Sequence, residues 1–297
     1  MNSYHGRFAP SPSGLLHFGS LVAAVGSYLR ARSLNGFWHL RIEDIDITRC
    51  KPEYSSGIIK DLEHLGMHFD GPVIYQSKRL SFYQEKLDEL ISLGLTYNCS
   101  CTRADIKSMG GIYTGRCRNL NLSASPERSI RYRNDYYVES FTDSLHGRIT
   151  NPEKKPQDII LKRRDGIFAY NLVCLLDDID TGITEVVRGS DLLYDTFSQI
   201  SLLQGLKAPV PQYLHLPLAL SENRQKYSKQ NHATHIDVSR PGIILVKAIE
   251  FLGQKMPDEI EHEKPEVILN YAVKNFNPDL IPSENRRIEA QITTGSW

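Results

Sequence analysis

The sequence predicts an α/β fold with a parallel sheet, an inserted segment and a small helical C-terminal region. Strand-like and helix-like segments alternate at the start of the chain, and this alternation stops at a cluster of cysteines and resumes further on. The chain has 297 residues, of which 40% are hydrophobic and 24% are charged. These values are typical of a globular protein and exclude disordered, collagen-like and low-complexity classes. The length allows one large domain or two ordinary ones.

A βαβα rhythm occupies residues 1–97. Residues 4–9 form an extended run before a Pro/Gly-rich turn, and the segments that follow are a helical pattern over 19–35, an alternating strand over 37–43, and helical patterns over 52–66 and 78–93. Such a rhythm implies parallel strands covered by helices. Gly36 is expected to end the first helix as a C′ glycine.

The rhythm breaks over residues 98–170, which we therefore predict to be an insertion. This segment has extended runs at 136–141 and 158–163, and its Asp165-Gly166 pair is typical of a tight hairpin turn. The α/β pattern resumes over residues 171–236, with an apolar run at 172–176, an alternating strand at 183–188 and a helix at about 194–203. Residues 237–297 are expected to form the small helical region, with helices at 241–252 and 266–276.

The charge balance excludes a global electrostatic attraction to polyanions. Lysine and arginine number 35, aspartate and glutamate number 35, and the formal net charge is zero. Any nucleic acid must therefore be bound by a local patch. No apolar run approaches the ~18 residues of a membrane span, and the first residues do not resemble a signal peptide. We expect a cytoplasmic location, no membrane association and no obligate protein partner.

Cysteine spacing predicts a metal site. Three of the five cysteines, Cys99, Cys101 and Cys117, lie within nineteen positions. Clustered thiolates are the soft ligands that zinc prefers, and a structural site needs a fourth ligand. We expect one structural zinc ion in a reducing compartment; the alternative is three buried free cysteines. Cys50 and Cys174 stand alone and are interpreted as packing residues.

Two short motifs indicate a nucleotide site. The sequence His17-Phe18-Gly19-Ser20 follows the first predicted strand, at the sheet edge where open α/β folds bind ligands. Gly19 allows a nucleotide to approach the backbone, and His17 can donate a hydrogen bond to a phosphate. Far downstream, Lys226-Tyr227-Ser228-Lys229-Gln230 suits a loop that clamps a pyrophosphate. Taken singly, each motif could instead be a surface turn or a solvated charge run.

Together these motifs resemble the HIGH and KMSKS signatures of class I aminoacyl-tRNA synthetases. The segments around them are similar to the glutamyl-tRNA synthetase catalytic domain, namely GRFAPSPSG at 6–14, RIEDID at 41–46, Tyr170 followed by Asp177-Asp178, and Val187-Arg188-Gly189. The resemblance extends from about residue 4 to residue 235. It implies a Rossmann-like catalytic domain, split by the insertion, that activates glutamate with ATP to form glutamyl adenylate. Mg²⁺ is expected to accompany ATP.

Two departures from the glutamyl-tRNA synthetase pattern indicate which branch of that family the chain resembles. Only sixty-seven residues follow Gln230, which leaves little room for an anticodon-binding module, and Cys174 stands where the family usually has asparagine. Length, motif spelling and cysteine spacing resemble the truncated paralogues that attach glutamate to the queuosine base in the anticodon of tRNA(Asp). The implied partners are ATP, L-glutamate and queuosine-containing tRNA(Asp).

Three alternatives remain open at this stage. A short glutamyl-tRNA synthetase could charge the 3′ end of tRNA(Glu), and a nucleotidyltransferase of related fold could use the histidine turn on another substrate. A non-catalytic synthetase-like module could bind RNA or regulate a partner. The short C-terminal region disfavours the first alternative, the set of Arg7, Glu43 and Arg188 disfavours the second, and retention of both His17 and Lys229 disfavours the third.

The resemblance assigns roles to individual residues. The implied glutamate pocket consists of Arg7, Ser11, Glu43, Tyr170 and Arg188. The implied ATP site consists of His17, Gly19, Lys226, Ser228 and Lys229, of which His17 and Lys229 are the catalytic pair. The implied zinc ligands are Cys99, Cys101, Tyr113 and Cys117. The aspartates Asp44, Asp46, Asp177 and Asp178 are expected to cap helices or position nucleotides and receive no chemical role.

A local basic patch supports RNA contact by the insertion. Residues 103–133 contain seven basic side chains, namely Arg103, Lys107, Arg116, Arg118, Arg128, Arg131 and Arg133, against one aspartate and one glutamate. Tyr113 and Tyr132 could add stacking surface. Without the resemblance such a run would be interpreted as a solvated face.

Overall fold

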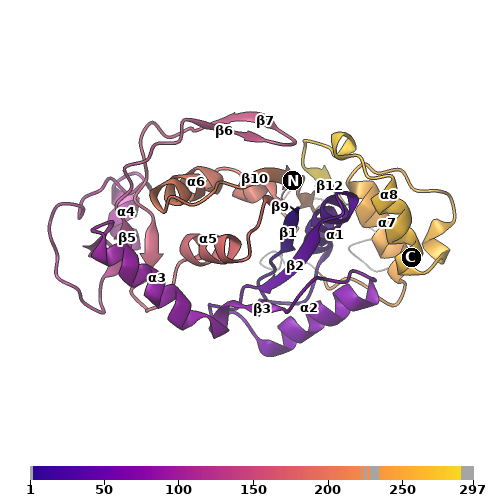
Figure 1. Cartoon of the computed structure of the whole chain (residues 1–297), viewed down its shortest axis with the longest axis horizontal. Helices are drawn as coiled ribbons and strands as arrows, with labels where there is room; N and C mark the ends of the chain where they lie inside the picture. Colours follow the sequence, from indigo (N-terminus) through magenta and orange to yellow (C-terminus); the bar gives the residue numbers. More distant parts are fainter. Residues whose placement is uncertain (1–2, 222, 224–225, 228–233, 289–297) are drawn as a thin grey trace.

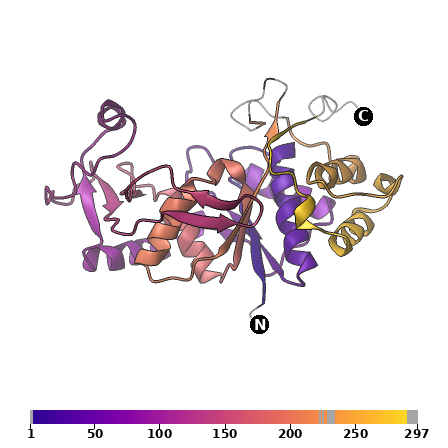
Figure 2. The same cartoon turned by 90° about the horizontal axis from the view of Figure 1, so that it is seen from above.

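The computed structural model describes residues 3–221, 223, 226–227 and 234–288. Ser228 and Lys229, two predicted ATP-site residues, lie outside these ranges. A central α/β part lies between the insertion at one end and the C-terminal helices at the other (Figures 1 and 2). None of the helices in the described ranges combines the length and apolar character needed to cross a membrane.

The central part contains the predicted parallel sheet. Strands β1 (His5–Phe8), β2 (Phe37–Ile42) and β3 (Ile74–Tyr75) pair in parallel, as do β9 (Glu185–Gly189) and β10 (Gln212–Leu216). The group of β1, β2 and β3 lies next to the group of β9 and β10. At their junction Thr184 N, next to β9, donates to His5 O of β1 at 2.9 Å. The carboxyl ends of β1, β2 and β9 therefore meet at one edge, where open α/β sheets bind ligands.

Helices connect and cover these strands. Their bounds are α1 (Phe18–Ser33), α2 (Pro52–His64), α3 (Leu80–Ser92), α5 (Tyr170–Asp180) and α6 (Asp195–Gly205), with short 3₁₀ turns at Gln76–Lys78 and Ser190–Leu192. The apolar run at 172–176 lies inside α5. The prediction for the end of α1 was wrong in one detail: Asn35, with φ of 51°, adopts the left-handed conformation, and Gly36 N donates to Ala31 O. Gly36 is needed because a Cβ there would lie 2.7 Å from Tyr4.

The segment predicted to be an insertion, together with the two residues before it, contains an antiparallel sheet and a separate hairpin. Strands β4 (Thr96–Cys99), β5 (Ser129–Tyr132) and β8 (Ile160–Lys162) form the sheet, beside the short helix α4 (Arg103–Ser108). The expected turn at Asp165-Gly166 is present, with Gly166 at φ of 81°. The hairpin of β6 (Ser140–Asp143) and β7 (Gly147–Thr150) lies against β10 of the central sheet (Figure 1).

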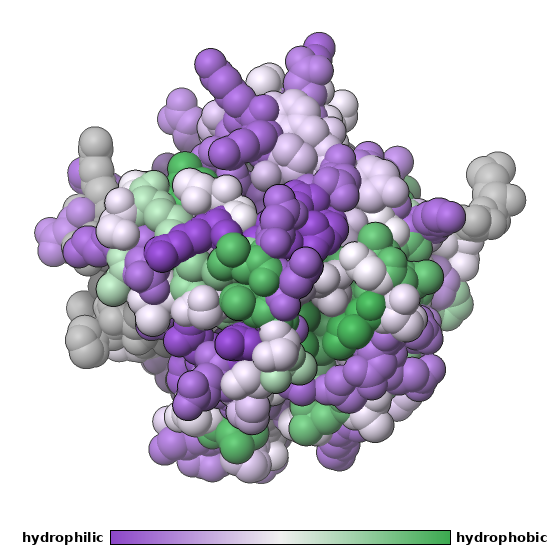
Figure 3. Space-filling view, turned by 90° about the vertical axis from the view of Figure 1, so that its left-hand side faces the viewer, coloured by the Kyte–Doolittle hydropathy of each residue, from purple (hydrophilic) through white to green (hydrophobic). Residues whose placement is uncertain are grey.

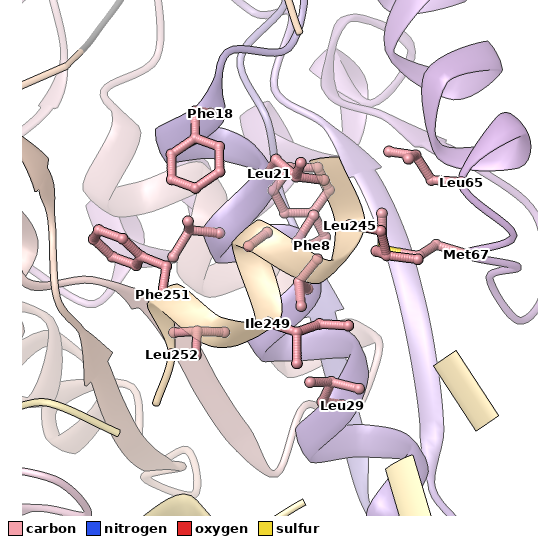
Figure 4. Close-up of a cluster of buried hydrophobic side chains, with 14 of the residues drawn as sticks. Phe8, Phe18, Leu21, Leu29, Leu65, Met67, Leu245, Ile249, Phe251 and Leu252 are labelled. Carbon is pink, nitrogen blue, oxygen red and sulfur yellow. The ribbon is translucent and has the colours of Figure 1, made fainter. Parts of the chain in front are cut away.

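The C-terminal helices pack directly on the central part. Helices α7 (Pro241–Phe251) and α8 (Pro265–Lys274) cover α1, and short 3₁₀ turns lie at Ile260–His262 and Pro278–Leu280. Figure 4 shows side chains of α7 and its end packed against Phe18, Leu21 and Leu29 of α1. Strand β11 (Ala219–Leu220) lies just before the predicted pyrophosphate loop in the sequence. It pairs in parallel with β12 (Arg286–Arg287).

Candidate active site and metal centre

A cavity of about 580 Å³ lies at the carboxyl edge of β1 and β9. Its wall comes from β1, the turn after it, the start of α1, the end of β2, α5 and β9. Every predicted glutamate and ATP residue within the described ranges lines it, namely Arg7, Ser11, His17, Gly19, Glu43, Tyr170, Arg188 and Lys226. Segments more than two hundred residues apart in sequence thus share one pocket.

The two signature segments meet at His17. His17 begins α1 as its N-cap, where its Nδ1 accepts from Ser20 N at 3.2 Å and Ser20 Oγ accepts from His17 N at 2.8 Å. Because Nδ1 accepts, the proton of the neutral ring lies on Nε2. The ring lies edge-on to Tyr227, with centroids 6.0 Å apart.

The structure shows a second reason for a glycine at position 19, which is the close approach of another part of the backbone. A Cβ at this position would lie 3.0 Å from the carbonyl oxygen of Tyr227. The missing side chain therefore lets the backbone of the downstream segment approach the start of α1. Lys226 is next to Tyr227 in the chain, and its ammonium pairs with the carboxylate of Asp191, which also lines the cavity.

A buried charge network fixes the floor of the cavity. Asp178 Oδ1 accepts from Arg7 Nε at 3.2 Å and from Arg41 Nη1 at 2.5 Å, and Arg41 Nη2 donates to Glu43 Oε1 at 3.2 Å. These four side chains are buried. Burial would raise the pKa of Asp178, but the guanidinium groups of Arg41 and Arg7 outweigh it and lower the pKa. Asp178 is therefore an anion that orients Arg7.

Nearby arginines offset the cost of burying the Glu43 carboxylate less completely than they do for Asp178. Burial raises the pKa of Glu43, and the nearby Arg41 and Arg7 offset this only in part. A cation bound in the cavity beside Glu43 would stabilise its carboxylate. An ammonium group on the ligand fits this position, and Arg7 supplies a complementary cation for a carboxylate.

The aspartates without an assigned role are structural. Asp44 accepts from Ser77 N and Oγ at 2.8 and 2.6 Å, and Asp46 accepts from Thr48 Oγ1. Asp177 accepts from Gln76 Nε2 at 2.8 Å and from Tyr83 OH, which joins α5 to α3. Sequence reasoning missed Arg41 and the partners of Arg188, which are His215 and Thr196. A lone arginine inside the apolar strand β2 was the available signal for Arg41.

The three clustered cysteines converge as predicted from their spacing. Their Sγ atoms lie within 4.8 Å of one another, and Cys101 Sγ is 3.6 Å from Cys117 Sγ. Tyr113 OH is 3.7 Å from Cys99 Sγ. Sulfur ligands at ~2.3 Å from a tetrahedral zinc ion are about 3.8 Å apart, so these separations fit such an ion.

The surroundings of the cluster also fit a cation. Burial raises the pKa of the Cys117 thiol, but hydrogen bonds from Ser100 and the other two cysteines outweigh it and lower the pKa to about 7. Cys117 N donates to Tyr113 OH at 2.9 Å, and the Arg131 guanidinium lies 3.8 Å from the centre of the Tyr113 ring. Burial raises the pKa of the Tyr113 phenol and outweighs the amide hydrogen bond, which lowers it, and burial also raises the pKa of the Cys101 thiol to about 12. Both groups would therefore release a proton on binding a metal ion. Cys174 is buried and Cys50 partly buried, away from this cluster.

The seven basic residues of the predicted patch differ in their partners, and one of them, Arg128, donates to the backbone oxygen of Ser123 and to its Oγ. Arg118 pairs with Asp135 and Asp158, while Arg131 and Arg133 lie on the rings of Tyr113 and Tyr97, so these three arginines stabilise the insertion itself. Three others are exposed and form no ion pair or hydrogen bond with the described part of the chain, namely Arg103, Lys107 and Arg116. Hydrophilic side chains cover much of this end of the molecule, with smaller hydrophobic patches between them (Figure 3).

Comparison with solved structures supports the fold. A glutamate-tRNA synthetase from Elizabethkingia anophelis superposes with a TM-score of 0.81 at 22% identity, covering 98% of this chain and 69% of that one. A glutamate tRNA ligase from Elizabethkingia meningosepticum, solved in complex with its amino acid, gives a TM-score of 0.79 at 23% identity, covering 98% and 68%. At these identities the likeness shows the fold alone.

Sequence comparison shows the family. The family model described as tRNA synthetases class I (E and Q), catalytic domain, matches residues 4–252. A glutamyl-Q tRNA(Asp) synthetase of Vibrio parahaemolyticus is 50% identical over 96% of each chain, and that of Escherichia coli is 49% identical over 94% of this chain and 91% of its own. The chain therefore belongs to the class I tRNA synthetases of the E and Q type, in the group of the glutamyl-Q tRNA(Asp) synthetases.

Proposed function

We propose that this chain activates L-glutamate with ATP and transfers the glutamyl group to the queuosine base of tRNA(Asp). The observation that carries the proposal is the cavity that combines Arg7, Glu43 and Arg188 with His17 and Lys226. Two guanidinium groups and one carboxylate match the two carboxylates and the ammonium of glutamate. The names of relatives at 46% and 50% identity support the RNA substrate.

In the first step, a carboxylate oxygen of glutamate attacks the α-phosphate of ATP. The new bond joins that oxygen to the α-phosphorus, and the bond to the β-phosphate oxygen breaks, so pyrophosphate leaves with its electrons. Arg7 and Arg188 hold glutamate, Glu43 accepts from its ammonium, and Ser11 and Tyr170 complete the pocket. His17 and Lys229 stabilise the charge that grows on the leaving pyrophosphate. Mg²⁺ bound to ATP would neutralise phosphate charge.

In the second step, the glutamyl group passes from the adenylate to the modified base, and AMP leaves. We propose that the insertion contacts the RNA and that Cys99, Cys101, Tyr113 and Cys117 hold one structural zinc ion there. The spacing of their ligand atoms supports this assignment. The exposed cations of the insertion supply a local positive surface on a chain with no net charge.

The experiment that tests the function offers ATP, labelled glutamate and total tRNA from cells with and without queuosine. We expect label only on tRNA(Asp) from queuosine-containing cells, in the anticodon fragment after nuclease digestion. Label at the 3′ end of tRNA(Glu) would instead favour a short glutamyl-tRNA synthetase. RNA binding with no glutamate-dependent exchange of pyrophosphate into ATP would favour a non-catalytic module.

A further inference from the structure

A buried histidine connects the wall of the cavity to the hairpin of the insertion. His215, on β10, lies between Asp143 of β6 and Arg188 of β9. Its Nδ1 is 2.7 Å from Asp143 Oδ2, and its Nε2 is 3.1 Å from Arg188 Nε. The exposed fractions are 1% for Asp143, 0% for His215 and 7% for Arg188. The three residues come from segments that no sequence motif joins.

The hydrogen-bond chemistry of arginine fixes the tautomer of His215. A guanidinium group has donors and no acceptor, so Arg188 Nε must donate and His215 Nε2 must accept. The ring proton then lies on Nδ1 and is donated to the Asp143 carboxylate. Asp143 also accepts from the backbone N of His215 at 3.1 Å, which holds the carboxylate and the ring in one orientation.

These contacts leave one end of Arg188 for a ligand. Its Nε is used by His215, and its Nη2 donates to Thr196 Oγ1 at 2.8 Å and to Leu192 O at 3.2 Å. The remaining nitrogen, Nη1, has no hydrogen bond with the described part of the chain, and Arg188 lines the cavity. The ring of Tyr213 lies 5.8 Å from the guanidinium carbon.

We propose that His215, oriented by Asp143, is a positioning residue that aims Arg188 at a carboxylate of the substrate. The inference rests on the proposed function, because it takes Arg188 as a glutamate ligand. It adds that the β6–β7 hairpin helps to build the amino acid site, since Asp143 Oδ1 accepts from Leu145 N and His146 N at 3.0 Å and so closes the hairpin turn.

The arrangement requires a neutral imidazole. The groups that face His215 are Asp143 on β6, Arg188 on β9, Thr196 on α6 and His146, whose Nε2 is 3.0 Å from His215 O. Burial lowers the pKa of His215, and the Asp143 carboxylate only partly offsets this. A protonated ring would lose the acceptor for Arg188 and place two cations side by side.

Two substitutions of His215 separate its hydrogen bond to Asp143 from its hydrogen bond to Arg188. In His215→Asn, an amide nitrogen can still donate to Asp143, but no atom reaches Arg188. In His215→Gln, the longer side chain can place an oxygen where Nε2 accepts from Arg188. We expect His215→Asn to raise KM for glutamate about tenfold or more in pyrophosphate exchange, with kcat changed less than about threefold. His215→Gln should restore KM to within about threefold, and KM for ATP should stay unchanged in both.

The variant Asp143→Asn is a second test, because it changes the residue that orients His215. With its amide oxygen facing His215 Nδ1, the variant loses the negative charge, and its amide nitrogen replaces the Oδ1 that accepts from Leu145 N and His146 N. We therefore expect a rise in KM for glutamate of about threefold together with a lower Tm, because the hairpin turn is also weakened. Trp38→Phe is the matched control, because it removes a buried hydrogen bond to Ser27 Oγ in the central core, keeps an aromatic ring beside Phe8, and changes no residue that lines the cavity or contacts Arg188. It should lower Tm without changing KM.

The outcomes are distinguishable. If the wild-type enzyme shows no glutamate-dependent exchange, the proposed function fails and the inference with it. If the wild type is active and His215→Asn keeps the wild-type KM for glutamate, only the inference is overturned. The inference is also overturned if the histidine variants and Trp38→Phe lose Tm and activity in parallel, because His215 would then be a packing residue.

Discussion

Arg7 and Arg188 both reach the cavity, but different buried partners hold them. Arg7 is paired with Asp178, whereas Arg188 is bonded to the neutral ring of His215. Asp178 belongs to a segment that resembles the family, but its pairing with Arg7 was not predicted. His215 belongs to no recognised motif, and it is 72 positions from its partner Asp143. The sequence could therefore predict which arginines line the cavity, because these lie in matching segments. It could not predict what orients them, because only the fold brings those residues together.

Substitutions should separate substrate binding from chemistry. Arg7→Ala and Arg188→Ala each remove charge-assisted hydrogen bonds worth roughly 1.5–3 kcal/mol in both ground and transition states, so KM for glutamate should rise about tenfold or more. Lys229→Ala removes a cation that meets charge growing on pyrophosphate, so kcat of activation should fall by about 10²–10³ with little change in KM. Steady-state pyrophosphate exchange measures both. A wild-type kcat in Lys229→Ala would contradict the mechanism.

The neutral state of His215 should make folding stability depend on pH. Because burial lowers its pKa in the folded protein, the unfolded chain binds a proton from about pH 6.5 downward while the folded ring does not. Stability is therefore present above this pH and lost as pH falls through the window below it, by at most about 1.4 kcal/mol from this ring at pH 5.5. Urea unfolding at pH 7.5 and 5.5 measures the loss, and His215→Gln should show correspondingly less of it. Equal losses in both proteins would contradict this origin.

At the scale of elements, long periodic segments were predicted well and the insertion less completely. The ranges expected for α1, α2, α3 and α7 agree with the structure to within a few residues, because each has a continuous apolar stripe and a clear stop. The β6–β7 hairpin was only half recognised, as an extended run at 136–141, because its strands have four residues each. Its stability comes from packing on β10, which no local pattern records.

The metal site should be separable from the catalytic cavity. The cysteine cluster lies in a small core with Tyr97 and Tyr113, and none of these residues lines the cavity. We expect about one equivalent of zinc per chain, lost in Cys99→Ser/Cys101→Ser. That variant should lose transfer to RNA more than pyrophosphate exchange. Cys50→Ser, outside the cluster, is the control and should keep the metal. A metal-free protein that folds and transfers glutamate normally would contradict the assignment.

At the scale of the whole molecule, the proposed glutamate site and the proposed RNA contact lie in different parts of a chain whose formal net charge is zero. The insertion lies at one end and the C-terminal helices at the other (Figure 2). The residues that line the cavity belong to the central part between them. We expect activation of glutamate to need only the central part, because every described residue of the proposed glutamate and ATP sites lines the cavity there, whereas transfer also needs RNA placed against it. This separation means that charge at the insertion can be removed without touching any residue of the cavity wall.

The exposed cations of the insertion should therefore affect transfer alone. In the triple variant Arg103→Ala, Lys107→Ala and Arg116→Ala, KM for tRNA should rise, and the slope of log affinity against log salt should weaken by roughly 0.7–0.9 for each phosphate that is no longer neutralised. Pyrophosphate exchange without RNA should keep its wild-type rate. The matched control removes the same charge from exposed lysines at the opposite end, Lys255, Lys264 and Lys274. If the two triple variants weaken transfer equally, total charge rather than the insertion surface attracts the RNA, and the proposed contact is wrong.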